Sequence, residues 1–263
     1  MQSDSNILQV KNLSKFFGGL AAVSNCSLKI KKGSITGIIG PNGSGKTTLF
    51  NLIAGNLVSS KGTVVFNDED ITNIPSYELF SKGVLRTFQI AHEFTNLTVL
   101  ENLMMVPGKQ SGENLVNALF NPGVVKKEEA IVKEKALEVI DFLNLKHLSN
   151  ELAGNLSGGQ KKLLELGRTM MVDAKLVLLD EVGAGVNRTL LKEIGSAILR
   201  LNKEKGYTFC MIEHDMEFIS RLCNPVIVMA EGSVLFEGTS DEVKNNEQVI
   251  ESYLGRGSKL KDK

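Results

Sequence analysis

The run from Gly40 to Thr47 constrains this chain more than any other feature. It reads Gly-Pro-Asn-Gly-Ser-Gly-Lys-Thr and satisfies the pattern G-x-x-x-x-G-K-[ST] in full. A short apolar strand is predicted just before it, at Ile35–Ile39, and a helix is predicted to continue from Thr48. Glycines in such a loop let backbone N–H groups converge on phosphate oxygens, and the following helix adds its positive N-terminal end. The motif therefore predicts a strand–loop–helix unit that binds phosphate groups.

Two side chains of this loop have separate expected roles. Lys46 would neutralise the β- and γ-phosphates of a nucleotide, and the Thr47 hydroxyl would bind Mg²⁺. The predicted nucleotide-binding residues of the loop are Gly40, Pro41, Asn42, Gly43, Ser44, Gly45, Lys46, Thr47 and Thr48.

A second apolar strand, Leu176–Leu179, is followed directly by Asp180 and Glu181. Ligands of a parallel sheet bind at the C-terminal edge of its strands. Asp180 would hold Mg²⁺, usually through water, and Glu181 would act as general base on the attacking water. Asp180 and Glu181 could instead be two solvated acids at the end of a strand. The phosphate loop elsewhere in the chain favours the catalytic interpretation.

The bulk composition is that of an ordinary globular protein. Of 263 residues, 42% are hydrophobic and 23% charged, and 30 basic residues balance 30 acidic ones, so the strong basic bias of a nucleic-acid binder is absent. Three scattered cysteines argue against a disulfide framework or a zinc site. With no signal-peptide pattern and no apolar run of about 18 residues or more, we expect a cytosolic chain that does any membrane work through a partner.

The order of predicted elements indicates an α/β fold. Strands Ile7–Val10 and Cys26–Ile30, joined by a turn at Gly18–Gly19, look antiparallel. Short apolar strands then alternate with amphipathic helices, which is typical of a mostly parallel central sheet covered by helices.

The middle of the chain departs from this alternation. From Thr98 to about Asn150 the pattern is helical, with its clearest helix predicted at Lys126–Leu143. We therefore expect a core of residues 1–97 and 173–263 and an inserted helical subdomain of residues 98–172. The apolar face predicted for the clearest helix consists of Ile131, Val132, Leu137, Val139, Ile140 and Leu143.

The run Leu156-Ser-Gly-Gly-Gln160 opens another helix within the insert. Ser157 alone could be a plain N-cap, but Gly158 and Gly159 are costly in a first helical turn unless the backbone must approach a ligand closely. With this run, the chain resembles the nucleotide-binding subunit of an ABC transporter over nearly its whole length. The resemblance implies a P-loop NTPase cassette that binds and hydrolyses ATP with Mg²⁺.

The resemblance also implies roles for residues outside the phosphate loop. Phe17 would stack on adenine, with Phe16 as the rival stacking residue. Gln89 would touch Mg²⁺ or water and sense the partner. His214, in Ile-Glu-His-Asp, would contact the γ-phosphate and position the base. Ser157, Gly158, Gly159 and Gln160 would bind the ATP held by a second cassette, so that ATP is clamped in a dimer.

Two positions depart from the family pattern. Val182 stands where relatives usually have proline, and Asn187 ends a run, Ala184-Gly-Val-Asn187, where many relatives have aspartate. Val182 removes no reacting group, so hydrolysis is still expected. Asn187 keeps hydrogen bonding but loses charge, which would alter communication across a dimer.

The partner is expected to be a membrane permease, with this chain peripheral on the cytoplasmic face and paired with itself or with a second, different cassette. Softer runs such as Arg86-Thr-Phe-Gln and Val249-Ile-Glu-Ser-Tyr-Leu-Gly resemble branched-chain amino acid importers. Importers of urea or short amides and cassettes for lipopolysaccharide export resemble this chain too. A soluble cassette acting on ribosomes or DNA and a regulatory cassette without turnover are the remaining alternatives, and no nucleic-acid partner is expected.

Overall fold

The computed structural model describes residues 5–87, 93–108, 110–113, 120–172 and 174–258. The chain forms two compact units. The first consists of Met1–Arg86, Lys175–Gly183 and Ile198–Lys263, and the second of Thr87–Ala174 and Ala184–Ala197. The predicted subdomain limits of 98 and 172 stay a prediction, because the second unit takes in a further segment at Ala184–Ala197.

The centre of the first unit is a six-stranded sheet in the order β10-β9-β3-β8-β7-β6. Neighbours are parallel except for the antiparallel pair β9–β10. Every residue of β3, β7 and β8 is buried, as expected for the continuous apolar strands of a sheet covered on both faces. The strands are β3 (Ile35–Ile39), β6 (Val84–Arg86), β7 (Leu176–Asp180), β8 (Thr208–Ile212), β9 (Val226–Ala230) and β10 (Ser233–Gly238).

A second sheet of the same unit is antiparallel, in the order β2-β1-β4-β5. The predicted hairpin is present and is longer than expected, because β1 and β2 continue to the turn at Gly18–Gly19. Its strands are β1 (Asn6–Phe17), β2 (Leu20–Lys31), β4 (Lys61–Phe66) and β5 (Glu69–Asp70).

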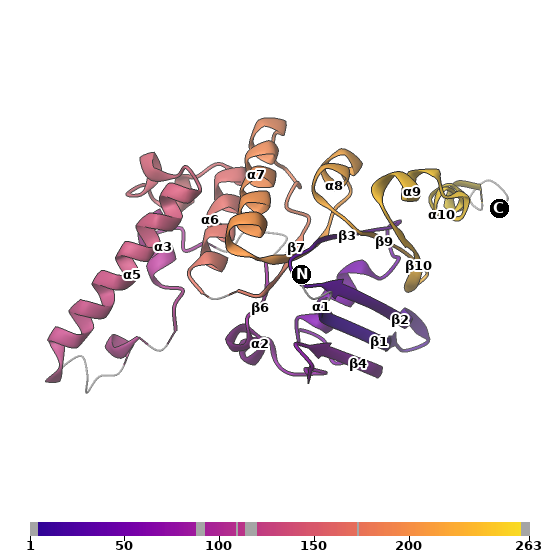
Figure 1. Cartoon of the computed structure of the whole chain (residues 1–263), viewed down its shortest axis with the longest axis horizontal. Helices are drawn as coiled ribbons and strands as arrows, with labels where there is room; N and C mark the ends of the chain where they lie inside the picture. The colour runs from indigo at the N-terminus through magenta and orange to yellow at the C-terminus, as the bar shows by residue number, and fades with distance from the viewer. Residues whose placement is uncertain (1–4, 88–92, 109, 114–119, 173, 259–263) are drawn as a thin grey trace. The chain divides into compact units, whose positions relative to one another are not determined.

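Helix α1 (Lys46–Ile53) connects the two sheets of the first unit. Its Leu49 and Phe50 are fully buried in one hydrophobic core that also contains Leu8 and Ile30 of the antiparallel sheet and Ile38 of the central sheet. Figure 1 shows α1 beside both sheets. The remaining helices of this unit are α2 (Ser76–Lys82), α8 (Met216–Leu222), α9 (Ser240–Asn245) and α10 (Glu247–Ser258).

The described part of the second unit is helical, as predicted, apart from one isolated bridge between Thr98 and Leu152. Helix α7 (Arg188–Lys205) begins in this unit and ends in the first. The other helices are α3 (Val99–Met104), α5 (Pro122–Phe142) and α6 (Gly158–Met170), with short 3₁₀ turns at Ser111–Glu113, Lys146–Leu148 and Ala153–Asn155.

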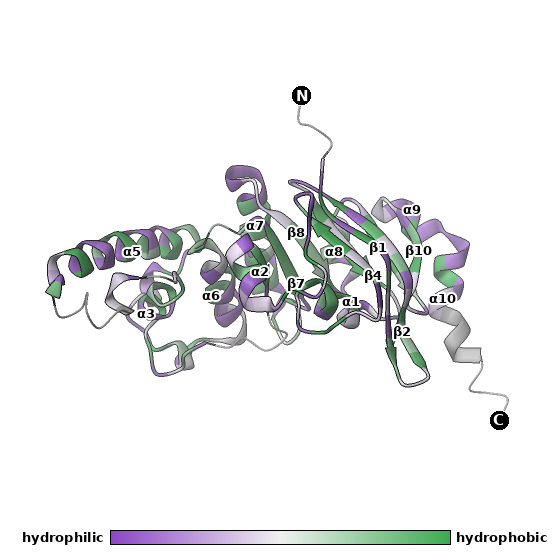
Figure 2. Ribbon diagram, turned by 90° about the horizontal axis from the view of Figure 1, so that it is seen from below, coloured by the Kyte–Doolittle hydropathy of each residue, from purple (hydrophilic) through white to green (hydrophobic). Residues whose placement is uncertain are grey.

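The apolar face predicted for α5 was partly wrong. Val139, Ile140 and Leu143 are buried, but Ile131 and Leu137 are exposed. Figure 2 shows hydrophobic and hydrophilic residues mixed along the whole helix, while only its C-terminal half supplies buried residues. Apolar periodicity alone therefore overestimated how much of this helix is packed. None of the described helices is long and apolar enough to cross a membrane.

Candidate functional site

The phosphate loop is shaped by close backbone contacts that only glycine allows. Gly40 has φ +150°, and a Cβ added there would lie 2.1 Å from the carbonyl oxygen of Met229. Gly45 has φ +97°, and a Cβ there would lie 2.4 Å from the carbonyl oxygen of Ala22. Both neighbours are backbone atoms that cannot move aside as a flexible side chain could. The glycines are therefore required by the chain itself.

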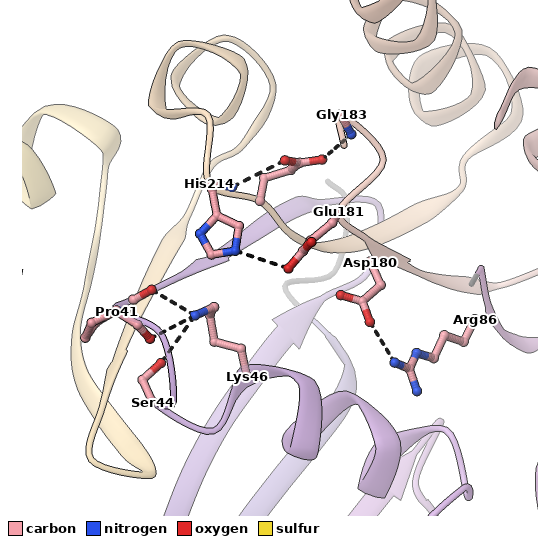
Figure 3. A network of polar contacts seen from close by, with 10 residues as sticks. Pro41, Ser44, Lys46, Arg86, Asp180, Glu181, Gly183 and His214 are labelled. Carbon is pink, nitrogen blue, oxygen red and sulfur yellow. Dashed lines mark hydrogen bonds and ion pairs between the residues drawn. The ribbon is translucent and has the colours of Figure 1, made fainter. Parts of the chain in front are cut away.

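Lys46, the first residue of α1, lies inside the curve of this loop (Figure 3). Its Nζ donates to the carbonyl oxygens of Gly40 at 2.8 Å and Pro41 at 3.1 Å, and lies 3.5 Å from the Ser44 hydroxyl. The side chain is buried, so loop carbonyls hold the ammonium in place. A positive charge enclosed by a glycine loop at a helix N-terminus fits the phosphate groups of a nucleotide.

The residues at the site also fit Mg²⁺. Asp180 supplies a carboxylate at the end of β7, and Thr47 supplies an exposed hydroxyl on the first turn of α1. Within the described residues no group of three or more His, Cys, Asp or Glu could hold a metal ion. Mg²⁺ does not need such a group, because it usually keeps several waters and takes one or two protein oxygens plus substrate phosphates.

Asp180 is buried and has a partner that the sequence analysis did not identify. Arg86, the last residue of β6, donates from Nη2 to Asp180 Oδ2 at 2.6 Å. The same guanidinium donates from Nη1 to Asn51 Oδ1 on α1. Because β6 and β7 are parallel neighbours, their ends meet at one sheet edge, where a carboxylate and a guanidinium can pair.

Glu181 and His214 come together at the same edge. Glu181 Oε1 lies 3.1 Å from His214 Nε2 (Figure 3). An ionised carboxylate only accepts, so in this contact the histidine Nε2 carries the proton. Glu181 also has φ +49°, a left-handed conformation that non-glycine residues other than Asn and Asp rarely adopt. The sequence had placed these two residues in one site, and the structure brings them into contact.

Glu213 is a buried residue of this edge that sequence reasoning missed. Its Oε1 accepts from the Gly183 N–H at 2.7 Å and its Oε2 from the His214 N–H at 3.3 Å. Burial raises the pKa of its carboxyl above the ordinary value, against the lowering effect of these two hydrogen bonds. Glu213 thereby connects the loop after Glu181 to the backbone of His214. An acid directly before a candidate histidine was the only sequence signal for it.

The C-terminal helix also reaches the phosphate loop. Burial raises the pKa of the Tyr253 phenol, on α10, against a smaller lowering effect of the nearby Gly40 backbone. No role for Tyr253 at the loop was predicted, because nothing in its local sequence pattern points to a residue more than 200 positions away.

The two candidate stacking residues lie side by side at the end of β1. Phe17 and Phe16 are both exposed, at 48% and 41% of their surface. The Lys15 ammonium lies 5.2 Å from the centre of the Phe17 ring. Exposure leaves both rings available to a base, so the choice between them stays a prediction.

The signature residues, which are Ser157, Gly158, Gly159 and Gln160, belong to the second unit and form a regular helix start. Ser157 caps α6: its hydroxyl accepts from the Gln160 N–H at 3.4 Å, and Gln160 Oε1 accepts from the Ser157 N–H at 2.9 Å. A Cβ on Gly159 would lie 2.0 Å from the Leu190 side chain of α7, whereas a Cβ on Gly158 would meet nothing closer than 3.8 Å. Packing against Leu190 therefore accounts for Gly159 but not for Gly158.

The two departures from the family pattern have structural roles. Val182 is buried and so adds to the core. Asn187 Oδ1 accepts from the Leu190 N–H at 2.9 Å at the start of α7, which an aspartate could do equally well. Gln89, the remaining predicted site residue, lies outside the described residues.

Comparisons with known proteins agree with this arrangement. Residues 23–184 match the ABC transporter family, and residues 233–259 match the family described as branched-chain amino acid ATP-binding cassette transporter. The probable branched-chain amino acid transport ATP-binding protein LivG of Archaeoglobus fulgidus is 45% identical over 95% of each chain.

Two solved structures are also similar. The ADP conformation of an ATP-binding cassette of an ABC transporter is 40% identical over 95% of this chain and 99% of that one, with a TM-score of 0.81. A dimeric post-hydrolysis cassette bound to ADP and Pi is 25% identical over 89% and 98%, with a TM-score of 0.71. The chain thus belongs to the ABC transporter family, as one of its ATP-binding, ATP-hydrolysing cassettes.

Proposed function

We propose that this chain hydrolyses Mg²⁺-bound ATP in a dimer of cassettes and thereby drives import of branched-chain amino acids through permease subunits. The observation that carries the hydrolytic part is the contact between Glu181 and His214 beside the phosphate loop. It joins a carboxylate that can accept a proton from water to an imidazole that can orient that carboxylate. The Archaeoglobus relative's name and the match at residues 233–259 support the solute.

In this proposal each group has one task. The loop from Gly40 to Thr48 binds the phosphates, and Lys46 neutralises them. Thr47, Asp180 and Gln89 hold Mg²⁺, which when bound offsets the charge of the phosphate oxygens. Glu181 accepts the proton of the attacking water, and His214 positions Glu181 and the terminal phosphate. Phe17 stacks on the base.

The dimer follows from the signature residues, which we assign to the nucleotide of a second cassette. Ser157, Gly158, Gly159 and Gln160 of one copy would close the site around Lys46 of the other. The dimeric post-hydrolysis relative supports this arrangement. The mate is either a second copy or a different cassette, and the complex would sit on the cytoplasmic face of the membrane against its permease.

Substitution of Lys46 tests the nucleotide assignment. Lys46→Ala should abolish binding of a fluorescent ATP analogue while leaving the circular dichroism spectrum unchanged, because the lysine donates to carbonyl oxygens of the phosphate loop rather than to the apolar core. Lys161→Ala, at an ion pair in the second unit, is a matched control for loss of a lysine. Unchanged affinity in Lys46→Ala would contradict the assignment.

Transport tests the solute. The chain would be reconstituted in proteoliposomes with the permease subunits that copurify with it, and uptake of labelled leucine would be compared with uptake of labelled urea. Leucine uptake that requires ATP and is lost in Lys46→Ala supports the proposal. ATP-dependent uptake of urea, or export of lipopolysaccharide, would move the chain to the corresponding alternative.

A further inference from the structure

Arg86 lies where three parts of the candidate site meet. It ends β6, and its Nη2 donates to Asp180 Oδ2 at the end of β7 (Figure 3). Its Nη1 donates to Asn51 Oδ1 on the helix that follows the phosphate loop. In the sequence it stands three residues before Gln89. One guanidinium thus links the phosphate-loop helix to the proposed Mg²⁺ carboxylate.

The pair formed by Arg86 and Asp180 is buried. The side chain of Asp180 is 2% exposed and that of Arg86 is 12% exposed. Among the residues that the structure describes, the buried Arg86 Nε has no hydrogen-bond partner. A buried ion pair with an unsatisfied donor adds little net stability, because desolvation of both charges offsets their attraction. Stability alone is therefore a poor explanation for an arginine at this position.

We propose that Arg86 is a positioning residue of the nucleotide site, which holds and neutralises the Asp180 carboxylate so that the empty site does not retain a divalent cation. The inference rests on the proposed assignment of Asp180 to Mg²⁺. The guanidinium cancels most of the negative field that a free cation would meet at this edge. The nucleotide phosphates supply the negative charge that makes cation binding favourable.

Removal of the arginine should lower the stability of the nucleotide-free protein and raise its affinity for Mg²⁺. In Arg86→Gln, Asp180 becomes a buried carboxylate without its cationic partner, which destabilises the nucleotide-free protein. The same unpaired carboxylate becomes a better site for Mg²⁺. Mg²⁺ alone should then stabilise the variant and should leave the stability of the wild-type chain unchanged.

The experiment measures chemical denaturation of the full chain without nucleotide, with and without millimolar MgCl₂. We expect Arg86→Gln to lower the folded-to-unfolded ratio by about 10²–10³-fold, the usual cost of breaking a buried pair. We expect MgCl₂ to recover at least about tenfold of that ratio in the variant and to leave wild type unchanged. Asp180→Asn in the Arg86→Gln background should recover a similar part without Mg²⁺ and should abolish the Mg²⁺ response. Arg200→Gln, which removes an exposed pair with Glu204, is the matched control and should show neither effect.

Three results would overturn the proposal. They are an equal Mg²⁺ response in wild type and Arg86→Gln, no response in either, or a response that survives Asp180→Asn. If Arg86→Gln does not fold, Asn51→Ala removes only the second contact of the guanidinium and should show the same Mg²⁺ response at smaller size. Binding of an ATP analogue to wild type is measured in parallel, so loss of the proposed function and loss of this inference are separate outcomes.

Discussion

The phosphate loop and the signature turn both place glycines at the start of a helix, yet the chain explains them differently. In the phosphate loop, Gly40 and Gly45 are required because backbone oxygens of distant strands lie where a side chain would be. In the signature turn, Ser157 and Gln160 cap each other locally, and no atom of the described residues comes closer than 3.8 Å to a Cβ added at Gly158. Packing within the described residues thus explains the glycines of the first motif, whereas it does not explain Gly158 of the second. This contrast favours a second cassette as the signature's ligand-bearing partner.

The largest effect is expected at Glu181, which contacts His214 at the edge of the central sheet. Glu181→Gln should lower ATP turnover by about 10²–10⁴-fold, the usual worth of a general base, while ATP binding stays nearly unchanged. The amide keeps size and hydrogen bonding toward His214 but cannot accept the proton. Phosphate release and equilibrium binding measure the two effects. Turnover at the wild-type rate would remove Glu181 from the mechanism.

Glu181→Gln also tests whether the signature turn acts across a dimer interface. Without turnover, ATP should hold two cassettes together, so Glu181→Gln should elute as a dimer from a sizing column with ATP and as a monomer without it. If the native mate is a different cassette, that mate must be added. Adding Gly158→Ala to Glu181→Gln should prevent the ATP-dependent dimer. A dimer that survives this change would contradict a role for the signature turn across the interface.

Alanine in place of each glycine sharpens the contrast. Gly45→Ala should destabilise the isolated chain by at least about 1–3 kcal/mol, because its backbone is left-handed and the Ala22 oxygen blocks the new methyl group. Gly158→Ala should leave stability unchanged or slightly higher, since alanine favours a helix by up to about 1 kcal/mol over glycine. Thermal and chemical denaturation without ATP measure both. Equal loss of stability in the two variants would remove the distinction between the motifs.

How far the sequence could predict this structure depends on the range of the contacts. The strand β3 was predicted residue for residue, at Ile35–Ile39, because a short, mostly apolar run ends there at the first glycine of the phosphate loop. The short strand β6 was missed, since three residues carry no period. The capping role of Ser157 was foreseen as an alternative, because a cap involves residues three apart.

The long-range partners of the site could not be predicted in the same way. Arg86 pairs with a residue 94 positions away, and Glu213 with one 30 positions away. Both contacts arise because parallel strands bring their ends to one edge, and a single sequence does not give the strand order. The sequence thus predicted Asp180, Glu181 and His214 as site residues but did not predict Arg86 and Glu213, which hydrogen bond at the same sheet edge.

A smaller effect is expected from the exposed end of β1. Phe17→Ala should weaken ATP binding by about 1–3 kcal/mol, the range for loss of an aromatic ring stacked on a base. Stacking reads little of the base, so purine nucleotides should bind with similar affinities. Phe16→Ala is the matched control, because the two rings are similarly exposed. An effect confined to Phe16→Ala would assign stacking to the neighbouring residue.

The smallest effect is expected from two acids whose pKa values are shifted in opposite directions. Glu213 lies at the edge of the central sheet and has partners distant in sequence, whereas Glu101 lies in α3 and has a partner three residues away. Burial raises the pKa of Glu213, so its contribution to stability is full below the ordinary value of 4.5 and is lost as pH rises through the folded-state pKa. Glu101 has the opposite sign. The backbone N–H and hydroxyl of Thr98 donate to it and lower its pKa, so its contribution is present above 4.5 and is lost as pH falls through the folded-state value. Denaturation midpoints from about pH 3 to 8 should therefore show Glu213→Gln gaining on wild type as pH rises and Glu101→Gln gaining as pH falls, since acids with perturbed pKa values make stability depend on pH. Parallel pH profiles for the two variants would show that Glu213 is not held as a buried acid and would remove it as the link between Gly183 and His214.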